Sequence, residues 1–142
     1  MLFIYFYQFI SSMDLARSTI MPLTIFKVQP GHEDVISVDK EGSSGFTLHS
    51  PISLDIPPHA HCDILFPLCV GIPAGHVGIL KTVGSLSRRY ALNSVDSVIH
   101  PYYRGNIHMS LINDGPDLVE LRKGDPVYNL IVVPVNMNHV FI

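Results

Sequence analysis

The stretch SVIHPYYRGNIHMSLIND, residues 97–114, carries the clearest fold signal in this chain. It contains the β-rich run GNIHMSLIN (105–113), and the residues before that run include the turn formers Pro101 and Gly105. Proline and glycine interrupt extended runs and mark turns between them. The stretch therefore predicts a β-hairpin.

The same pattern of short extended runs and turns continues along the chain beyond Met21. The other runs are LTIFKV (23–28), DVISV (34–38), GFTLHS (45–50), ISLDI (52–56), CDILFPLCV (62–70), HVGILKTV (76–83), SVDSVI (94–99), DLVELR (117–122) and VYNLIVVPV (127–135). The segment GSLSRRYALNS (84–94) is at most a short helix or turn, because it lacks capping signals. Many short strands separated by turns predict an all-β sandwich or jelly roll.

Length and composition fit one globular domain. The chain has 142 residues, and its net charge of -3 offers no basic surface for nucleic acid. Hydrophobic residues make up 47% and charged ones 15%, which excludes disorder and favours apolar contacts with other subunits or partners. Cys62 and Cys69 are too few for a disulfide framework, so we expect reduced thiols in an intracellular protein.

The N-terminal run MLFIYFYQFI (1–10) is apolar at nine of ten positions. It is too short to cross a membrane, which takes about 20 apolar residues, and no basic residue precedes it as in a signal peptide. We expect an apolar extension over residues 1–20, a β domain over 21–135 and a short tail over 136–142. Three methionines are alternative natural starts: Met1, Met13 and Met21.

Four segments resemble, in this order, the motifs of a known enzyme family. They are SSGFTLHSPISLDIPPHAH (43–61), GIPAGHVGILKTVGSLS (71–87), SVIHPYYRGNIHMSLIN (97–113) and LRKGDPVYNLIVVPV (121–135). Tyr103-Arg104-Gly105 and Lys123-Gly124-Asp125 anchor the match. The family is that of the trimeric deoxyuridine triphosphatases (dUTPases). Its motifs read Ala-Gly-x-Asp-Leu, Arg-Ser-Ser or Arg-Ser-Gly, Gly-Val-Ile-Asp-x-x-Tyr-Arg-Gly, and Gly-Asp-Arg-Ile-Ala-Gln-Leu-Ile.

The resemblance implies a dUTPase-like distorted jelly roll, a homotrimer, and sites shared among its subunits. It also implies hydrolysis of dUTP to dUMP and pyrophosphate, with Mg²⁺ bridging the phosphates. In the family, the third-motif Asp activates the attacking water and the first-motif Asp supports the metal-bearing side. The Arg and Ser of the second motif and the Gln of the fourth contact phosphates, and a glycine-rich fifth motif closes over the nucleotide.

At the family's catalytic positions this chain carries different residues. The first-motif Asp falls on Thr47, and the water-activating Asp falls on His100. The second-motif Arg and Ser fall on Val83 and Gly84, although Ser85 follows directly. Thr47, His100 and Val83 lack the charge of the Asp or Arg that each replaces, and Gly84 lacks the hydroxyl of the Ser.

The fourth motif and the C-terminus depart as well. The fourth-motif Arg and Gln fall on Pro126 and Asn129, and no glycine follows Val135, so we expect no fifth motif. Tyr103, which in the family packs beneath the deoxyribose, is retained. If nucleotide binding persists, the contacting residues would be Ser85, His100, Tyr103 and Asn129.

These substitutions predict a catalytically degenerate dUTPase homologue without a cofactor, acting as a viral accessory or signalling protein through protein contacts. A general base is worth about 10²–10⁴-fold and one charge-stabilising contact about 10²–10³-fold, so we expect little hydrolysis. The alternative is a Mg²⁺-dependent dUTP diphosphatase, or a pyrimidine-nucleotide binder, with a substituted site. In that case His100, oriented by Asp96, would act as the base.

The segment HAHC (59–62) offers three potential metal ligands. In a strand, His59 and His61 would face away from Cys62, and no second Cys/His pair lies at zinc-finger spacing. We therefore expect surface histidines and no metal site.

The chain ends in the pattern apolar-x-apolar-carboxylate, formed by Val140, Phe141 and Ile142. PDZ domains bind such ends by strand addition; the alternative is a last strand packed on a neighbouring subunit. A degenerate site with this end resembles the non-enzymatic adenovirus early-region-four, first-reading-frame proteins, and so do Ser44-Gly45, Ser50-Pro51-Ile52 and Ile56-Pro57-Pro58. That resemblance implies PDZ partners in the host cytoplasm or nucleus, although those proteins typically carry Ser or Thr where this chain has Val140.

Overall fold

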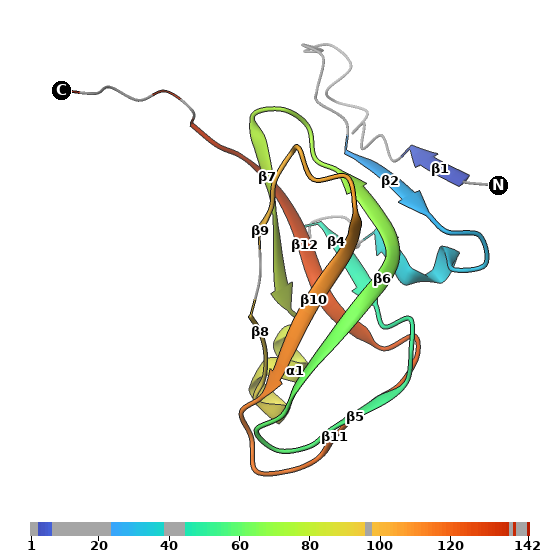
Figure 1. Cartoon of the computed structure of the whole chain (residues 1–142), viewed down its shortest axis with the longest axis vertical. Coiled ribbons are helices and arrows are strands. Elements are labelled where there is room, and N and C mark those ends of the chain that lie inside the picture. Colours follow the sequence, from blue (N-terminus) through green and yellow to red (C-terminus); the bar gives the residue numbers. More distant parts are fainter. Residues whose placement is uncertain (1–2, 7–23, 39–44, 96–97, 137, 139–141) are drawn as a thin grey trace.

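The computed structural model describes residues 3–6, 24–38, 45–95, 98–136, 138 and 142. Its elements are almost entirely β-strands, and the all-β jelly-roll prediction is confirmed (Figure 1). Nearly every predicted run contains a strand. The segment 84–94 starts with the short helix α1 (Gly84–Tyr90), as its sequence indicates. No helix among the described residues has the length and apolar character needed to cross a membrane.

Two five-stranded sheets form the body of the fold. The first has the strand order β1 (Phe3–Phe6), β2 (Ile25–Val28), β6 (His61–Gly71), β10 (Asn106–Asn113) and β8 (Leu92–Ser94). The second has the order β3 (Ile36–Val38), β4 (Phe46–His49), β12 (Pro126–Pro134), β7 (His76–Thr82) and β9 (Val98–Ile99). A small ribbon of β5 (Leu54–Ile56) and β11 (Val119–Leu121) closes one end, and the 3₁₀ turn η1 (Glu33–Val35) precedes β3.

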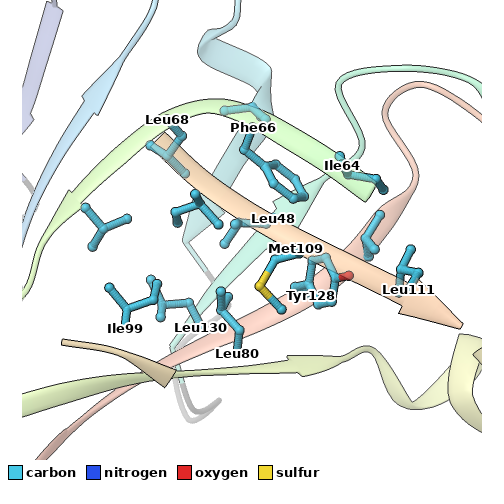
Figure 2. Close-up of a cluster of buried hydrophobic side chains, with 14 of the residues drawn as sticks. Leu48, Ile64, Phe66, Leu68, Leu80, Ile99, Met109, Leu111, Tyr128 and Leu130 are labelled. Atoms are coloured by element: carbon cyan, nitrogen blue, oxygen red, sulfur yellow. The ribbon is translucent and has the colours of Figure 1, made fainter. Parts of the chain in front are cut away.

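The core lies between the two sheets because each contributes the inward-facing side chains of its strands. On β10 the buried residues alternate with less buried ones, as expected for a strand with one covered face. Figure 2 shows side chains from both layers meeting in one cluster. Phe66 of β6 and Tyr128 of β12 meet edge to face, with ring centroids 5.9 Å apart, so aromatic contact joins the two layers.

The turn after β10 is held by a buried polar side chain, Asn113. Its amide nitrogen donates to the backbone oxygens of Ile56 at 2.9 Å and Asp117 at 2.7 Å, and its oxygen accepts from the Gly115 N–H at 3.0 Å. All three bonds run to backbone groups, and those to Ile56 and Gly115 are buried, so Asn113 fixes the β10–β11 connection against β5.

Part of the N-terminal apolar run forms a strand of the first sheet, and the division of the chain into residues 1–20, 21–135 and 136–142 stays a prediction. Phe3–Phe6 forms β1 and pairs antiparallel with β2, which leaves β2 paired on both sides. An apolar extended segment adds readily to a sheet edge, because the edge offers unpaired backbone groups. Residues 3–6 therefore belong to the first sheet, while the position of the natural start stays a prediction.

Candidate functional site

The predicted hairpin does not form, because its two strands belong to different sheets: β9 pairs with β7 in the second sheet, and β10 pairs with β6 and β8 in the first. Residues 100–105 connect the two sheets, and the Tyr103 N–H donates to the His100 carbonyl at 3.1 Å to form a turn. Beside this connection lies a pocket of about 570 Å³, called here the hairpin pocket after the segment that was predicted as a hairpin. Its lining residues are Leu80, Val95, Val98, Ile99, His100, Tyr103, Ile107, His108 and Met109.

Tyr103 is held in a fixed position in the hairpin pocket. Its hydroxyl donates to the Asn106 carbonyl at 2.7 Å. A Cβ on Gly105 would lie 2.8 Å from the Tyr103 hydroxyl oxygen, closer than side chains approach one another. The absence of a side chain at Gly105 therefore lets the tyrosine ring fold back over the turn, and 44% of Tyr103 stays exposed for a ligand.

Two imidazoles add polar groups to the hairpin pocket. His100 is exposed, and no hydrogen bond or ion pair between described residues involves its ring. His108 lies 3.8 Å from the Asp63 carboxylate, which also accepts a hydrogen bond from the Ser110 hydroxyl. Asp96, the predicted partner of His100, lies outside the described residues. The pocket therefore combines an apolar lining with a phenol and two imidazoles.

A second set of polar residues crosses the second sheet at one level. Ser37 pairs with Thr47, Thr47 with Asn129, and Asn129 with Lys81, so one residue comes from each of β3, β4, β12 and β7. Directly paired residues point to the same face of a sheet. These four residues, called here the polar row, therefore line one face, and the Thr47 hydroxyl donates to the Asn129 amide oxygen at 3.3 Å.

Ser37 of the polar row is hydrogen-bonded to His49. The Ser37 hydroxyl lies 2.8 Å from His49 Nε2, and His49 Nδ1 lies 3.0 Å from the Gly124 carbonyl oxygen. Because a carbonyl only accepts, Nδ1 donates to it and a neutral ring accepts from Ser37 through Nε2. This chain of bonds ties β3 and β4 to the turn before β12.

At the family's second-motif positions, neither Val83 nor Gly84 offers a side chain to a phosphate. Val83 is 8% exposed and its N–H donates to the Val127 carbonyl at 2.8 Å, so its side chain belongs to the core. Gly84 carries no side chain, and the Arg88 guanidinium lies over it, with Nε donating to the Gly84 carbonyl at 3.3 Å. Ser85 is exposed and keeps its hydroxyl available.

The hairpin pocket and the polar row are separate places within one chain. β9 is an edge strand, and β4 lies beyond β7 and β12, so Thr47 lies about 14 Å across the sheet from β9 at about 4.8 Å per strand. The register adds an offset along the strands, because Ile99 pairs with Gly78 whereas the polar row includes Lys81. Lys81 lies on β7 directly beside β9, so the polar row comes nearest to the pocket at Lys81.

The described residues do not fit a protein-bound metal. No group of three or more His, Cys, Asp or Glu side chains among them is arranged to hold an ion. At the position of the family's metal-side carboxylate, the Thr47 hydroxyl is bonded to Asn129. The HAHC segment also differs from the expected strand, because β6 begins at His61 and His59 lies in a turn with φ of 61°.

Several residues of these two sets were not expected from the sequence. Lys81 enters the polar row only through its pairing with Asn129, and His108 of β10 lines the same pocket as residues of β9 because the two sheets pack together. The alternation of β10 was the available signal for His108. The C-terminal Ile142 is exposed, whereas Val140 and Phe141 lie outside the described residues. Cys62 and Cys69 are both free thiols.

The family model for dUTPase matches residues 32–141, which include all four motif-like segments. The chain belongs to the dUTPase family. It is 25% identical over 117 residues to the deoxyuridine 5'-triphosphate nucleotidohydrolase of Encephalitozoon cuniculi, which covers 82% of this chain and 81% of that protein. It is 28% identical over 91 residues to the protein of the same name from Fowl adenovirus A serotype 1, covering 64% of this chain and 51% of that protein.

Solved structures agree with this family membership at the level of the fold. The dUTPase of Staphylococcus bacteriophage 80alpha superposes with a TM-score of 0.76 at 17% identity, covering 84% of this chain and 94% of that chain. The dUTPase-like jelly roll is therefore confirmed. The narrower resemblance to the adenovirus early-region-four proteins has no support among these matches and stays a prediction.

Proposed function

We propose that this dUTPase-family protein binds a pyrimidine deoxynucleotide in the hairpin pocket, with dUTP as the ligand to test first. The observation that carries the proposal is the fixed placement of Tyr103 by Asn106 and Gly105 in a pocket of about 570 Å³. Small-ligand sites are concave, mostly apolar, and carry a few fixed polar groups. The hairpin pocket has each of these properties.

The lining of the pocket suits a nucleoside in particular. Ile99 and Met109 are buried apolar residues, which suit the faces of a planar base or a sugar. The phenol of Tyr103 and the imidazoles of His100 and His108 offer hydrogen bonds to polar edges. Relatives named as deoxyuridine 5'-triphosphate nucleotidohydrolases support deoxyuridine as the nucleoside.

Hydrolysis of dUTP is the second candidate function, and the names of the relatives favour it. His100 is the group that would act on the attacking water, because it is exposed in the pocket at the position of the family's Asp. Two substitutions make efficient catalysis unfavourable. Thr47 replaces the metal-side carboxylate, and the buried Val83 replaces the phosphate-binding Arg. With the preorganised charges replaced, we expect turnover at least about 10²-fold below that of a family member with the acidic residues.

We also propose that the protein self-associates. The family resemblance supports a homotrimer. A role as an accessory protein that binds PDZ partners in the host cytoplasm or nucleus remains a prediction, tested by removing Ile142 and measuring capture by PDZ domains.

Calorimetry with deoxyuridine, dUMP and a non-hydrolysable dUTP analogue tests the binding proposal. Tyr103→Ala should weaken binding about tenfold, since stacking on an aromatic ring is worth about 1–3 kcal/mol per base. Tyr102→Ala is the matched control, because Tyr102 is 89% exposed and does not line the pocket. Failure of the unmodified protein to bind any of the three ligands at millimolar concentration would refute the proposal.

A pyrophosphate-release assay separates the two functions. Binding without pyrophosphate release identifies a nucleotide binder. Release that depends on His100, tested with His100→Ala, identifies a hydrolase. Release that is unaffected by His100→Ala would overturn the assignment of His100 as the base while leaving the binding proposal in place.

A further inference from the structure

We propose that Lys81 binds the phosphates of the nucleotide and replaces the cation that the family keeps at the position of Val83. This inference rests on the proposed function, because it assigns the phosphate end of the same ligand. It concerns the polar row and not the hairpin pocket.

Lys81 lies directly beside Asn129 in the second sheet. Asn129 aligns with the family's phosphate-binding Gln, and its direct partner on β7 is Lys81. Side chains of directly paired residues share a face, with Cβ atoms about 4.5–5.5 Å apart. The ammonium of Lys81 therefore reaches the same space as the Asn129 amide.

The polar row offers hydrogen-bond donors to a ligand. The Asn129 amide oxygen already accepts from the Thr47 hydroxyl at 3.3 Å, which leaves the amide NH₂ group to donate to a ligand. Lys81 adds donors and a positive charge, and it is exposed. Donors beside a cation form a site for an anion rather than for a metal or an amine.

The neighbouring charges leave Lys81 available to an anion. Val83 is buried, so the second-motif position supplies no cation. None of the ion pairs between described residues includes Lys81, whereas Arg122 is engaged with Asp55 and Glu120. The charge of Lys81 is therefore not consumed by a described carboxylate, and it lies beside Asn129.

Calorimetry of the full chain with inorganic tripolyphosphate and, separately, with deoxyuridine tests this assignment. Lys81→Gln should weaken tripolyphosphate binding about tenfold, since a charge-assisted hydrogen bond is lost. It should leave deoxyuridine binding unchanged. Lys81→Arg should restore most of the affinity, because the charge and donors return.

Lys27→Gln is the matched control, because Lys27 is equally exposed but lies on β2 of the other sheet. Its tripolyphosphate affinity should equal that of the unmodified protein. Equal weakening by both substitutions would show a non-specific charge effect and overturn the inference, and so would an unchanged affinity of Lys81→Gln. Sulfate that binds as tightly as tripolyphosphate would also overturn it, because the site would then hold any small anion.

The two proposals fail in different ways. If deoxyuridine does not bind but tripolyphosphate binds through Lys81, the hairpin pocket is wrongly assigned and Lys81 is not. If deoxyuridine binds and Lys81→Gln changes nothing, the nucleoside site stands and Lys81 is not its phosphate residue.

Discussion

Tyr128 offers the sharpest test of the packing in this protein. Its side chain is fully buried in the cluster of Figure 2, and its hydroxyl has no hydrogen-bond partner among the described residues. The ring itself packs against Phe66, with centroids 5.9 Å apart. Tyr128→Phe removes only the hydroxyl and keeps the ring, so we expect the protein to become more stable.

The expected gain follows from the cost of an unsatisfied buried group. Mutational data put that cost at about 1–3 kcal/mol, and part of it is offset by the small void that the missing oxygen leaves. A net gain of about 1–2 kcal/mol is therefore expected. With about 2.1 cal/mol/K of unfolding entropy per residue, the 142 residues convert this gain into a Tm rise of about 3–7 °C.

Thermal unfolding followed by circular dichroism, together with urea titration, measures this change. Tyr103→Phe is the control of opposite sign, because its hydroxyl donates to Asn106 at 2.7 Å and the substitution breaks that bond. We expect the control to lose about 0.5–1 kcal/mol. A Tyr128→Phe variant that is less stable than the parent would refute the reasoning, since the hydroxyl would then have a partner that stabilises it.

Further outcomes follow from the same structure. Burial raises the pKa of Tyr128 above its usual value near 10, so the unfolded chain loses this proton first as pH rises. Unfolding should therefore become easier above about pH 10, and denaturant titrations across pH 9–11 should show a smaller loss for Tyr128→Phe than for the parent. Asn113→Ala leaves several buried backbone groups unpaired and should cost about 2–4 kcal/mol in a urea titration; a loss below about 1 kcal/mol would contradict the structural role of Asn113. Gly105→Ala should displace the Tyr103 ring and weaken deoxyuridine binding in calorimetry while the melting temperature changes little; unchanged binding would show that the ring does not touch the ligand. His100→Asp should raise pyrophosphate release from dUTP if the missing Asp at position 100 is what limits hydrolysis. Unchanged release would show that the missing phosphate contacts limit hydrolysis instead.

Much of the fold was readable from the sequence because its signals are local. Strands β4, β6, β7, β10 and β12 coincide with apolar, β-branched runs bounded by Pro and Gly, and neither feature depends on distant residues. The hairpin pocket was partly predictable for the same reason. His100 and Tyr103 lie in one turn, so their proximity follows from the chain itself.

The polar row could be recognised only in the folded chain. Thr47 and Asn129 are 82 residues apart and meet because β4 pairs with β12 in one particular register, which brings Lys81 into line on β7. A shift of that register by one residue would turn each side chain to the opposite face. Register is fixed by the packing of two whole sheets around residues such as Tyr128, and that packing is a property of the tertiary structure. For this protein, the sequence determined the family, the strands and the turn at residues 100–103, whereas long-range pairing decided that the two strands flanking this turn join different sheets and which polar groups stand together.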